Sequence, residues 1–302
     1  MYIKRQGDHI QVVQKYSPTK DFVMVLRKMG GNAIFNISNP RAIYNTGSSV
    51  SHDLDSSVSF GSDTGESDWF GPHIVAAVKN RDGDRQANEF TGGAHNYDGN
   101  ADPSDSTATG RSDNIRLMVD GKETENFAGY ARQMVLSWDT YVQASNTKKA
   151  DGSGREVLVE HHTLMFDGVT WNTEVEIAFL EDVVWSTFYG LQTINFCWNQ
   201  DIRYDNGAWE PLGSATEALS KTCSLITVRN GADHLEMGLD NTYGIGNREY
   251  LYGSKTAGAF TRVYGPGNSK SYFNLVDGRG WRISGGTTVH FRGHYRFYYK
   301  TS

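Results

Sequence analysis

Residues 155–180, REVLVEHHTLMFDGVTWNTEVEIAFL, hold two runs of alternating apolar and polar side chains on either side of Asp167-Gly168. From Trp171 onward, the apolar side chains at every second position share one face, opposite Glu174 and Glu176. Such alternation is typical of a half-buried antiparallel strand, and Asp-Gly supplies the positive φ angles of a tight turn. We therefore expect a β-hairpin here, with Trp171 on the core face.

The same turn chemistry recurs along the chain, in six Asp-Gly and two Asn-Gly pairs that include Asp277-Gly278. Further β-rich runs predict strands at 22–28, 33–37, 74–78, 114–119, 133–142, 224–229, 259–264 and 289–299. Helical periodicity is nearly absent, and there is no repeat of 20–50 residues. We predict an all-β protein: a single domain over residues 1–302, forming a large, mainly antiparallel β-sandwich of the jelly-roll or supersandwich type with long loops. A closed barrel is the alternative.

Two segments are long enough to be functional or disordered loops. Residues 46–67 are rich in Ser, Asp, Gly and Thr, and we expect a mobile loop there. Residues 80–112 have a similar composition but also contain aromatic residues and the pair Gly92-Gly93. We expect this second loop to be shaped and functional.

The composition limits the function classes. The chain has 12% aromatic residues and a net charge of −6, and an acidic balance argues against a general nucleic-acid binder. No apolar run approaches the roughly 18 residues that span a bilayer, so we predict no membrane segment. The first residues lack the apolar run of a secretory signal peptide.

The sequence predicts no metal or cofactor. Cys197 and Cys223 are too few for a disulfide scaffold or a four-ligand zinc site, so we expect free structural thiols. Calcium is the alternative, because oxygen-bearing side chains gather between Asp98 and Asp105. That stretch lacks the bidentate Glu that ends a twelve-residue calcium loop.

The segment Thr91–Tyr97 is the most informative part of the second loop. Gly92-Gly93 lets the backbone approach a ligand closely. His95, Asn96 and Tyr97 then present an imidazole, an amide and a phenol in three successive positions. These groups can act as a general base, a donor that polarises a carboxylate, and a general acid. The alternative is a tight surface turn with His95 in solvent.

The last predicted strand, 289–299, has a basic face. Its alternation places His290, Arg292, His294 and Arg296 on that face and aromatic side chains on the other. Because Arg pairs bidentately with carboxylates and sulfates, this face favours an anionic sugar chain as the partner. The alternative is a solvated outer face whose cations pair with neighbouring Asp and Glu.

Residues 185–209 combine many aromatic side chains with interleaved amides. Aromatic rings together with amides are the chemistry of a carbohydrate cleft, because the apolar faces of sugar rings stack on aromatic faces. Phe196–Trp198 is typical of a core segment. We therefore expect Trp185, Tyr189 and Trp209 to lie near a ligand.

Three segments, DWFGPH (68–73), TGGAHNY (91–97) and DGSGREVL (151–158), resemble parts of tail-associated minor structural proteins of bacteriophages, particularly those of Gram-positive hosts. The similarity touches residues 65–195 in short pieces. It implies a virion module that contacts or degrades a surface polysaccharide. It assigns no catalytic or binding role to any particular residue of this chain. Such a module is released by lysis, so we expect the protein in the virion or outside the lysed cell, and otherwise in the cytoplasm.

Tyr272-Phe273-Asn274-Leu275 is similar to a segment of galactose mutarotase-like supersandwich proteins that follows a catalytic His. Lys270 stands where that His would be, and the segment comes later in this chain than in the family. The resemblance therefore implies the supersandwich architecture, which some polysaccharide lyases also resemble, rather than mutarotase activity.

We predict a tail-associated protein, in a homo-oligomer or a virion assembly, that recognises and in its enzymatic form depolymerises a cell-surface polysaccharide. The alternative is a polysaccharide lyase that acts on a uronic-acid polymer. In that enzyme Arg292 or Arg296, with Asn96, would bind the substrate carboxylate, while His95 and Tyr97 move the protons. This requires the second loop to fold over the last strand. A purely structural virion protein is the second alternative.

Overall fold

The computed structural model describes residues 1–29, 32, 34–50, 68–79, 89–97, 107–149, 153–213, 217–221, 223–247 and 258–301. Regular structure in this part of the chain is almost entirely β-strand, with single 3₁₀ turns at Ser145–Thr147, Phe196–Trp198 and Gly244–Gly246. None of the helices found there is long and apolar enough to cross a membrane. The prediction of an all-β protein is confirmed.

The strands form three antiparallel sheets. The five-stranded sheet consists, in spatial order, of β4 (Ile34–Tyr44), β3 (Lys20–Met29), β2 (His9–Ser17), β1 (Tyr2–Gln6) and β9 (Phe127–Tyr130). The ten-stranded sheet consists of β15 (Glu210–Pro211), β14 (Asp201–Tyr204), β17 (Leu225–Asn230), β18 (Asp233–Leu239), β21 (Thr288–Tyr299), β12 (Thr170–Phe179), β11 (Glu156–Phe166), β10 (Met134–Gln143), β7 (Gly110–Val119) and β8 (Lys122–Thr124). The six-stranded sheet consists of β16 (Glu217–Lys221), β19 (Ala259–Gly265), β20 (Asn268–Ile283), β13 (Val183–Ile194), β5 (His73–Ala77) and β6 (Phe90–Thr91).

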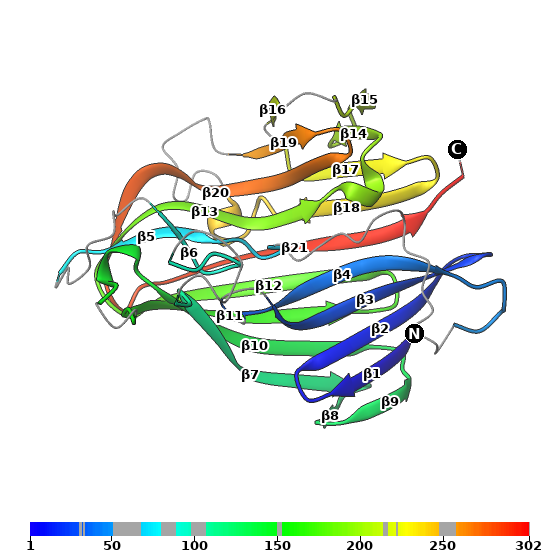
Figure 1. Ribbon diagram of the computed structural model, residues 1–302, viewed down its shortest axis with the longest axis horizontal. Helices are drawn as coiled ribbons and strands as arrows, with labels where there is room; N and C mark the ends of the chain where they lie inside the picture. Colours follow the sequence, from blue (N-terminus) through cyan, green and yellow to red (C-terminus); the bar gives the residue numbers. More distant parts are fainter. Residues whose placement is uncertain are drawn as a thin grey trace.

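The ten-stranded sheet is one layer of a sandwich, and both smaller sheets pack on the same face of it (Figure 1). Strand β21 shows this arrangement, because two side chains on one of its faces meet different sheets. Phe291 contacts Phe188 of β13, with ring centroids 5.6 Å apart, and Phe297 stacks on Phe22 of β3 at 4.5 Å. One hydrophobic core therefore runs through all three sheets.

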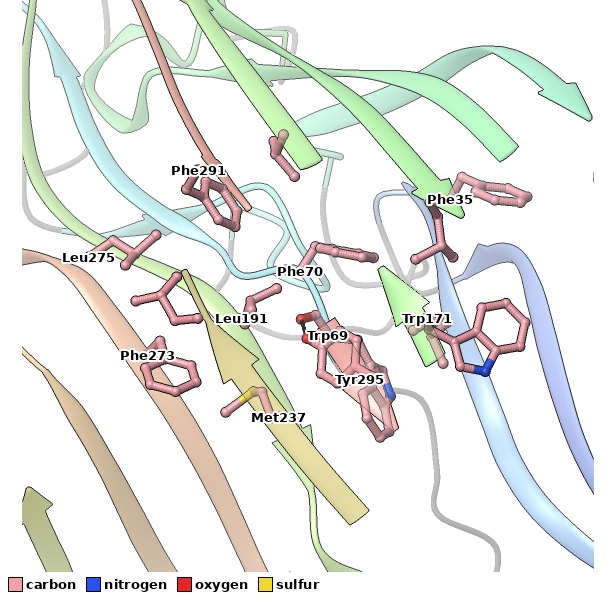
Figure 2. Close-up of a cluster of buried hydrophobic side chains, with 14 of the residues drawn as sticks. Phe35, Trp69, Phe70, Trp171, Leu191, Met237, Phe273, Leu275, Phe291 and Tyr295 are labelled. Carbon is pink, nitrogen blue, oxygen red and sulfur yellow. Dashed lines mark hydrogen bonds between the residues drawn. The ribbon is translucent and has the colours of Figure 1, made fainter. Parts of the chain in front are cut away.

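Trp69 and Phe70 join the two smaller sheets ahead of β5. Phe70 forms an isolated bridge with Leu191 of β13, and its carbonyl accepts a hydrogen bond from Asn36 of β4. Trp69 packs edge-on against Tyr295 of β21, whose hydroxyl donates to the carbonyl of Trp69 (Figure 2). The residues on either side of this pair are thereby fixed beside β13.

The predicted hairpin is β11–β12, and its register is the expected one. Trp171 is only 1% exposed and stacks on Phe166 with ring centroids 4.1 Å apart. In the turn, the Asp167 carboxylate accepts hydrogen bonds from two following backbone N–H groups, and Gly168 has a φ of 95°. The core position of Trp171 is confirmed.

The other predicted strands are present as well, but one predicted turn is wrong. Asp277-Gly278 lies inside β20 and not at a hairpin end. The pairing of β20 with β13 changes register between Trp185 and Thr187, so the surplus residues of β20 are accommodated as a bulge. Because Asp-Gly is found at bulges as well as at turns, the sequence alone misplaced it.

Two further predictions concern loops and cysteines. Cys197 and Cys223 are both buried and do not form a disulfide with each other, as expected. Residues 51–67 of the first predicted loop lie outside the described residues, as do 80–88 and 98–106 of the second. The calcium alternative between Asp98 and Asp105 falls in the last of these stretches.

Candidate functional site

The turn around His95 is held by a network of short contacts. Gly92 and Gly93 have φ values of 70° and 52°, and a Cβ on Gly93 would lie 2.3 Å from Oδ1 of Asp68, so this approach requires glycine. The side chain of Asn32 donates hydrogen bonds to the carbonyls of Gly93 and His95, both at 2.9 Å. These contacts place Nε2 of His95 3.5 Å from Oδ2 of Asp68.

The next two residues of the turn serve as anchors. Asn96 is 0% exposed and Tyr97 is 2% exposed. The hydroxyl of Tyr97 donates a hydrogen bond to Oε1 of Gln143 at 2.9 Å. Neither side chain lines the pocket that His95 enters, and the hydroxyl of Tyr97 is already engaged by Gln143. The predicted catalytic roles of Asn96 and Tyr97 therefore do not fit the structure, which uses them to fix the turn.

His95 itself lines a pocket of about 150 Å³ on the outer face of the six-stranded sheet. The other walls come from β13, β19, β20 and the segment before β5. Along β19, the residues at alternate positions are buried in the core, whereas Phe260, Arg262 and Tyr264 face outward into the pocket. Strand alternation thus turns one face of β19 into a wall of the pocket.

A row of aromatic rings lines this pocket. Phe260 and Tyr272 stack with centroids 4.6 Å apart and planes inclined by 15°. Tyr189 lies 5.0 Å from Tyr272, and Phe90 continues the row 5.6 Å from Tyr189 and stacks against His95 at 5.3 Å. Such a continuous aromatic wall suits a flat ligand with apolar faces.

Two tyrosines of the pocket, Tyr189 and Tyr272, are held in the protonated state. Burial raises the pKa of Tyr189, and burial together with the hydrogen bond to Tyr264 raises the pKa of Tyr272 further. The hydroxyl oxygens of Tyr264 and Tyr272 are 2.9 Å apart. At neutral pH the phenols of Tyr189 and Tyr272 therefore offer hydrogen bonds to a ligand and do not act as bases.

Polar groups without protein partners complete the pocket. Gln192 is 2% exposed, yet its Nε2 has no hydrogen-bond partner among the described residues. An unmatched buried donor costs about 1–3 kcal/mol unless an acceptor satisfies it. The exposed guanidinium of Arg262 makes no ion pair within the described part of the chain. Among the described residues that line the pocket, Lys270 is also basic and Asp68 is acidic.

The basic face of β21 lies on the opposite side of the sandwich. Arg292 points away from the core, because the residue before it packs inward against β13. Its Nε is 2.7 Å from Oδ2 of Asp240, and Nε2 of His294 is 3.2 Å from Oε1 of Glu236. His95 and Arg292 therefore occupy opposite outer faces. The predicted pairing of these two residues on one substrate is wrong, because the full thickness of the core separates them.

His290 and Arg296 share the basic face with Arg292, as the alternation predicted. The ring of His290 packs on Tyr243 at 4.6 Å, and the guanidinium of Arg296 lies 4.7 Å from the Tyr298 ring. Arg292 and His294 are paired with acids on neighbouring elements. For Arg292 and His294 the surface therefore matches the alternative of a solvated face paired with neighbouring acids, whereas Nε of Arg296 is buried without a hydrogen-bond partner among the described residues.

The three aromatic residues predicted near a ligand lie in three different environments. Trp185 is completely buried and donates its indole N–H to Nδ1 of His73 at 3.1 Å, and Nε2 of His73 lies 3.0 Å from Oε1 of Glu160. Its predicted position near a ligand is wrong, because β13 turns this side chain inward. Tyr189 lines the pocket beside His95. Trp209 lies in the segment between β14 and β15 of the ten-stranded sheet, away from Trp185 and from Tyr189.

Sequence reasoning missed most of the pocket. Phe260, Arg262 and Tyr264 share one face of the predicted strand 259–264, so alternation could have singled them out. In the sequence, Lys270 stands out only because it occupies the position where a similar segment of another family has a catalytic His. Nothing in the sequence indicated that β19 would lie beside the turn of His95.

No protein-family model matches the chain, and no curated protein matches it significantly. Among solved structures, the GH36 alpha-galactosidase AgaB from Geobacillus stearothermophilus is similar, with 9% identity over 100% of this chain and 41% of that chain and a TM-score of 0.49. An alpha-galactosidase from Lactobacillus brevis has 10% identity, 99% and 39% coverage and a TM-score of 0.46. A heparan sulfate lyase HepC mutant from Pedobacter heparinus has 8% identity, 100% and 37% coverage and a TM-score of 0.37. The chain spans about two fifths of the length of these proteins.

Proposed function

We propose that this protein binds a polysaccharide through the pocket on the outer face of the six-stranded sheet. The main support is the combination of a stacked aromatic wall with polar groups that have no partner among the described residues. The wall is formed by Phe260, Tyr272 and Tyr189, and the unmatched groups are Nε2 of Gln192 and the guanidinium of Arg262.

Each part of the pocket suits a feature of a sugar. The apolar face of a pyranose ring stacks on aromatic rings, while its hydroxyl groups accept hydrogen bonds from amides and phenols. The guanidinium of Arg262, which makes no ion pair within the described residues, favours a sugar with an acidic group. The volume of about 150 Å³ suits one sugar unit of a longer chain that continues into solvent.

We further propose that the protein is tail-associated and attaches a virion to its host. Two of the segments that resemble phage tail proteins contribute directly to the pocket: DWFGPH provides Asp68 and Pro72, and TGGAHNY provides His95. Labelled protein should bind intact Gram-positive cells, and enzymatic removal of the wall polysaccharide should abolish that binding. Binding that persists on stripped cells would contradict this role.

A polysaccharide lyase is the second candidate, favoured by the 3.5 Å contact between His95 and Asp68 in the pocket. His95 would remove the C5 proton of a uronate whose carboxylate is bound by Arg262. The released electron pair forms the C4–C5 double bond and expels the C4 oxygen, which takes a proton from the phenol of Tyr264. This arrangement replaces the earlier one with Tyr97 and Arg292.

The test is incubation with a panel of acidic and neutral cell-wall polysaccharides, followed by measurement of retention, chain length and ultraviolet absorbance of unsaturated sugars. We expect retention of an acidic polymer, with affinity reduced roughly 10- to 100-fold in Arg262→Ala, the effect of one charge-assisted hydrogen bond. The matched control is Arg292→Ala on the opposite face, which should bind like wild type.

The outcomes separate the candidate functions. Retention without chain shortening supports a binding protein. Shortening with an unsaturated product supports the lyase, and His95→Ala should then lower turnover by roughly 10²–10⁴-fold while binding persists. Failure to retain any polymer, or equal losses in Arg262→Ala and Arg292→Ala, would contradict the proposal and leave a purely structural virion protein.

A further inference from the structure

A second pocket, of about 300 Å³, lies on the outer face of the ten-stranded sheet. Arg229, His234 and Tyr298 are direct cross-strand partners on β17, β18 and β21 and form its floor. Tyr298 faces away from the core, because the preceding Phe297 packs inward against β3. The pocket is therefore on the side of the molecule opposite the one described above.

Trp209 closes this second pocket from the segment between β14 and β15. The guanidinium carbons of Arg229 and Arg203 lie 4.1 Å and 4.8 Å from the centre of its ring, and the ring of His234 lies edge-on at 5.8 Å. Two cation–π contacts of this kind fix both guanidinium groups in position before a ligand arrives.

The cations of this pocket are only partly neutralised. Nε of Arg229 is 2.8 Å from Oδ2 of Asp201. Arg203 and Lys300 make no ion pair within the described part of the chain, and Nε of Arg203 is buried without a hydrogen-bond partner. The pocket thus concentrates positive charge on a protein whose net charge is −6.

His234 adds a group of a different kind. Its Nδ1 is 2.9 Å from the carbonyl oxygen of Ala232, which can only accept, so Nδ1 carries the proton. Burial is the largest cause that lowers the pKa of His234, and Arg229 and Arg203 lower it further, so the ring is neutral at pH 7. Its Nε2 is then a hydrogen-bond acceptor, which matches a hydroxyl group and not an oxyanion.

We propose that this pocket is a second glycan site that binds an acidic sugar unit, with the acid group on Arg203 and Lys300 and a sugar hydroxyl on His234. Donors for an oxyanion, an acceptor for a hydroxyl and an aromatic edge together fit an acidic sugar better than a bare anion. A polymer as uniformly charged as nucleic acid is disfavoured by the acidic remainder of the protein. The proposal stands on its own contacts and does not depend on the first pocket.

The test is isothermal titration of the full chain with four probes: an oligogalacturonate, a sulfated galactan oligosaccharide, a neutral galactan oligosaccharide of equal length, and inorganic sulfate. At least one acidic oligosaccharide should bind, and Lys300→Glu should weaken it about tenfold or more. Arg203→Gln should weaken it comparably. The matched control, Lys122→Glu, makes the same change of charge at the opposite edge of the same sheet and should bind like wild type.

Several results would overturn the proposal. These are unchanged affinity in both Lys300→Glu and Arg203→Gln, equal binding of the neutral oligosaccharide, or binding of inorganic sulfate as tight as that of the oligosaccharides. Binding that is lost in Arg262→Ala but kept in Lys300→Glu would assign the acidic sugar to the first pocket alone. That result would leave the proposed function intact while removing this second site.

Discussion

The two outer faces of the sandwich use polar side chains in opposite ways. On strand β21, Arg292 and His294 are matched by Asp240 and Glu236 at 2.7 Å and 3.2 Å. On the six-stranded sheet, by contrast, Arg262 has no ion pair and the side-chain Nε2 of Gln192 has no hydrogen-bond partner among the described residues. Arg292 and His294 are therefore matched within the protein, whereas the pocket of the six-stranded sheet presents donors without a described partner.

This difference shows that residue type alone does not locate a ligand site. The basic strand β21 has the more conspicuous sequence, but acids from other elements pair with two of its basic side chains, Arg292 and His294. A buried donor that the fold leaves unmatched is the more informative feature, because folding incurs its desolvation cost without compensation. Four measurements test this difference.

The largest effect concerns the core that separates the two faces. Trp171→Ala should destabilise the protein by about 3–5 kcal/mol, the usual cost of truncating a large buried aromatic residue. Thermal or denaturant unfolding measures it. A melting shift under about 2 °C would mean that Trp171 is not on the core face, so β12 would be flipped and Glu174 would not face outward.

The next largest effect on stability is expected from a buried charge cluster around Glu160, which differs in its burial from the ion pairs of β21. Glu160 is held in the core by Nε2 of His73 at 3.0 Å and Nε2 of His162 at 3.3 Å. Burial alone would raise the pKa of Glu160, but the two histidines lower it more, to about 2 from an ordinary value of 4.5. The folded state therefore favours the ionised carboxylate.

Because the folded pKa is the lower one, Glu160 stabilises the protein above pH 4.5, and this stabilisation is lost as the pH falls from 4.5 toward 2. At about 1.4 kcal/mol per pH unit, the contribution is about 3 kcal/mol. Urea unfolding across this range should show a steeper loss in wild type than in Glu160→Gln. The control Glu123→Gln removes an exposed partner of Arg116 and should follow the wild-type curve. Identical slopes in wild type and Glu160→Gln would contradict the cluster's role.

The smallest effect is expected on strand β21. Arg292→Ala removes an exposed ion pair with Asp240, and such pairs contribute about 0–1 kcal/mol. We expect unfolding within about 1 kcal/mol of wild type and unchanged polysaccharide affinity. A loss of affinity in this variant would make the basic face a binding surface after all and would reverse the comparison between the two faces.

The fold was largely predictable because its strands follow a simple period. The alternation in β12 and β21 correctly separated inward from outward side chains, including Trp171 and Arg292. Strand β13 escaped prediction because register shifts around Trp185 and Tyr189 break its alternation. Those same irregularities placed Trp185 inside and left Tyr189 at the pocket.

The candidate site was predictable only in part, because distant segments build it. His95 was singled out correctly as a pocket residue, but its neighbours Asn96 and Tyr97 became anchors. The cations beside His95 come from β19 and β20, more than 160 residues later, and not from β21. Local pattern identifies which face of a strand is outward, but it does not tell which strands become neighbours.

The most direct test of the account is the substitution Gln192→Met, because it separates stability from binding. Met fills nearly the same volume as Gln and removes the unmatched Nε2 donor. Replacing an unsatisfied buried polar group by an apolar one is nearly neutral or stabilising, whereas a ligand that accepts from this donor loses a hydrogen bond. Urea unfolding and polysaccharide affinity should be measured on the same preparation. We expect unchanged or higher stability together with roughly tenfold weaker binding of the polymer that wild type retains. Unchanged affinity, or weaker binding that only accompanies a loss of stability, would contradict the claim that the unmatched groups of this pocket recognise the ligand.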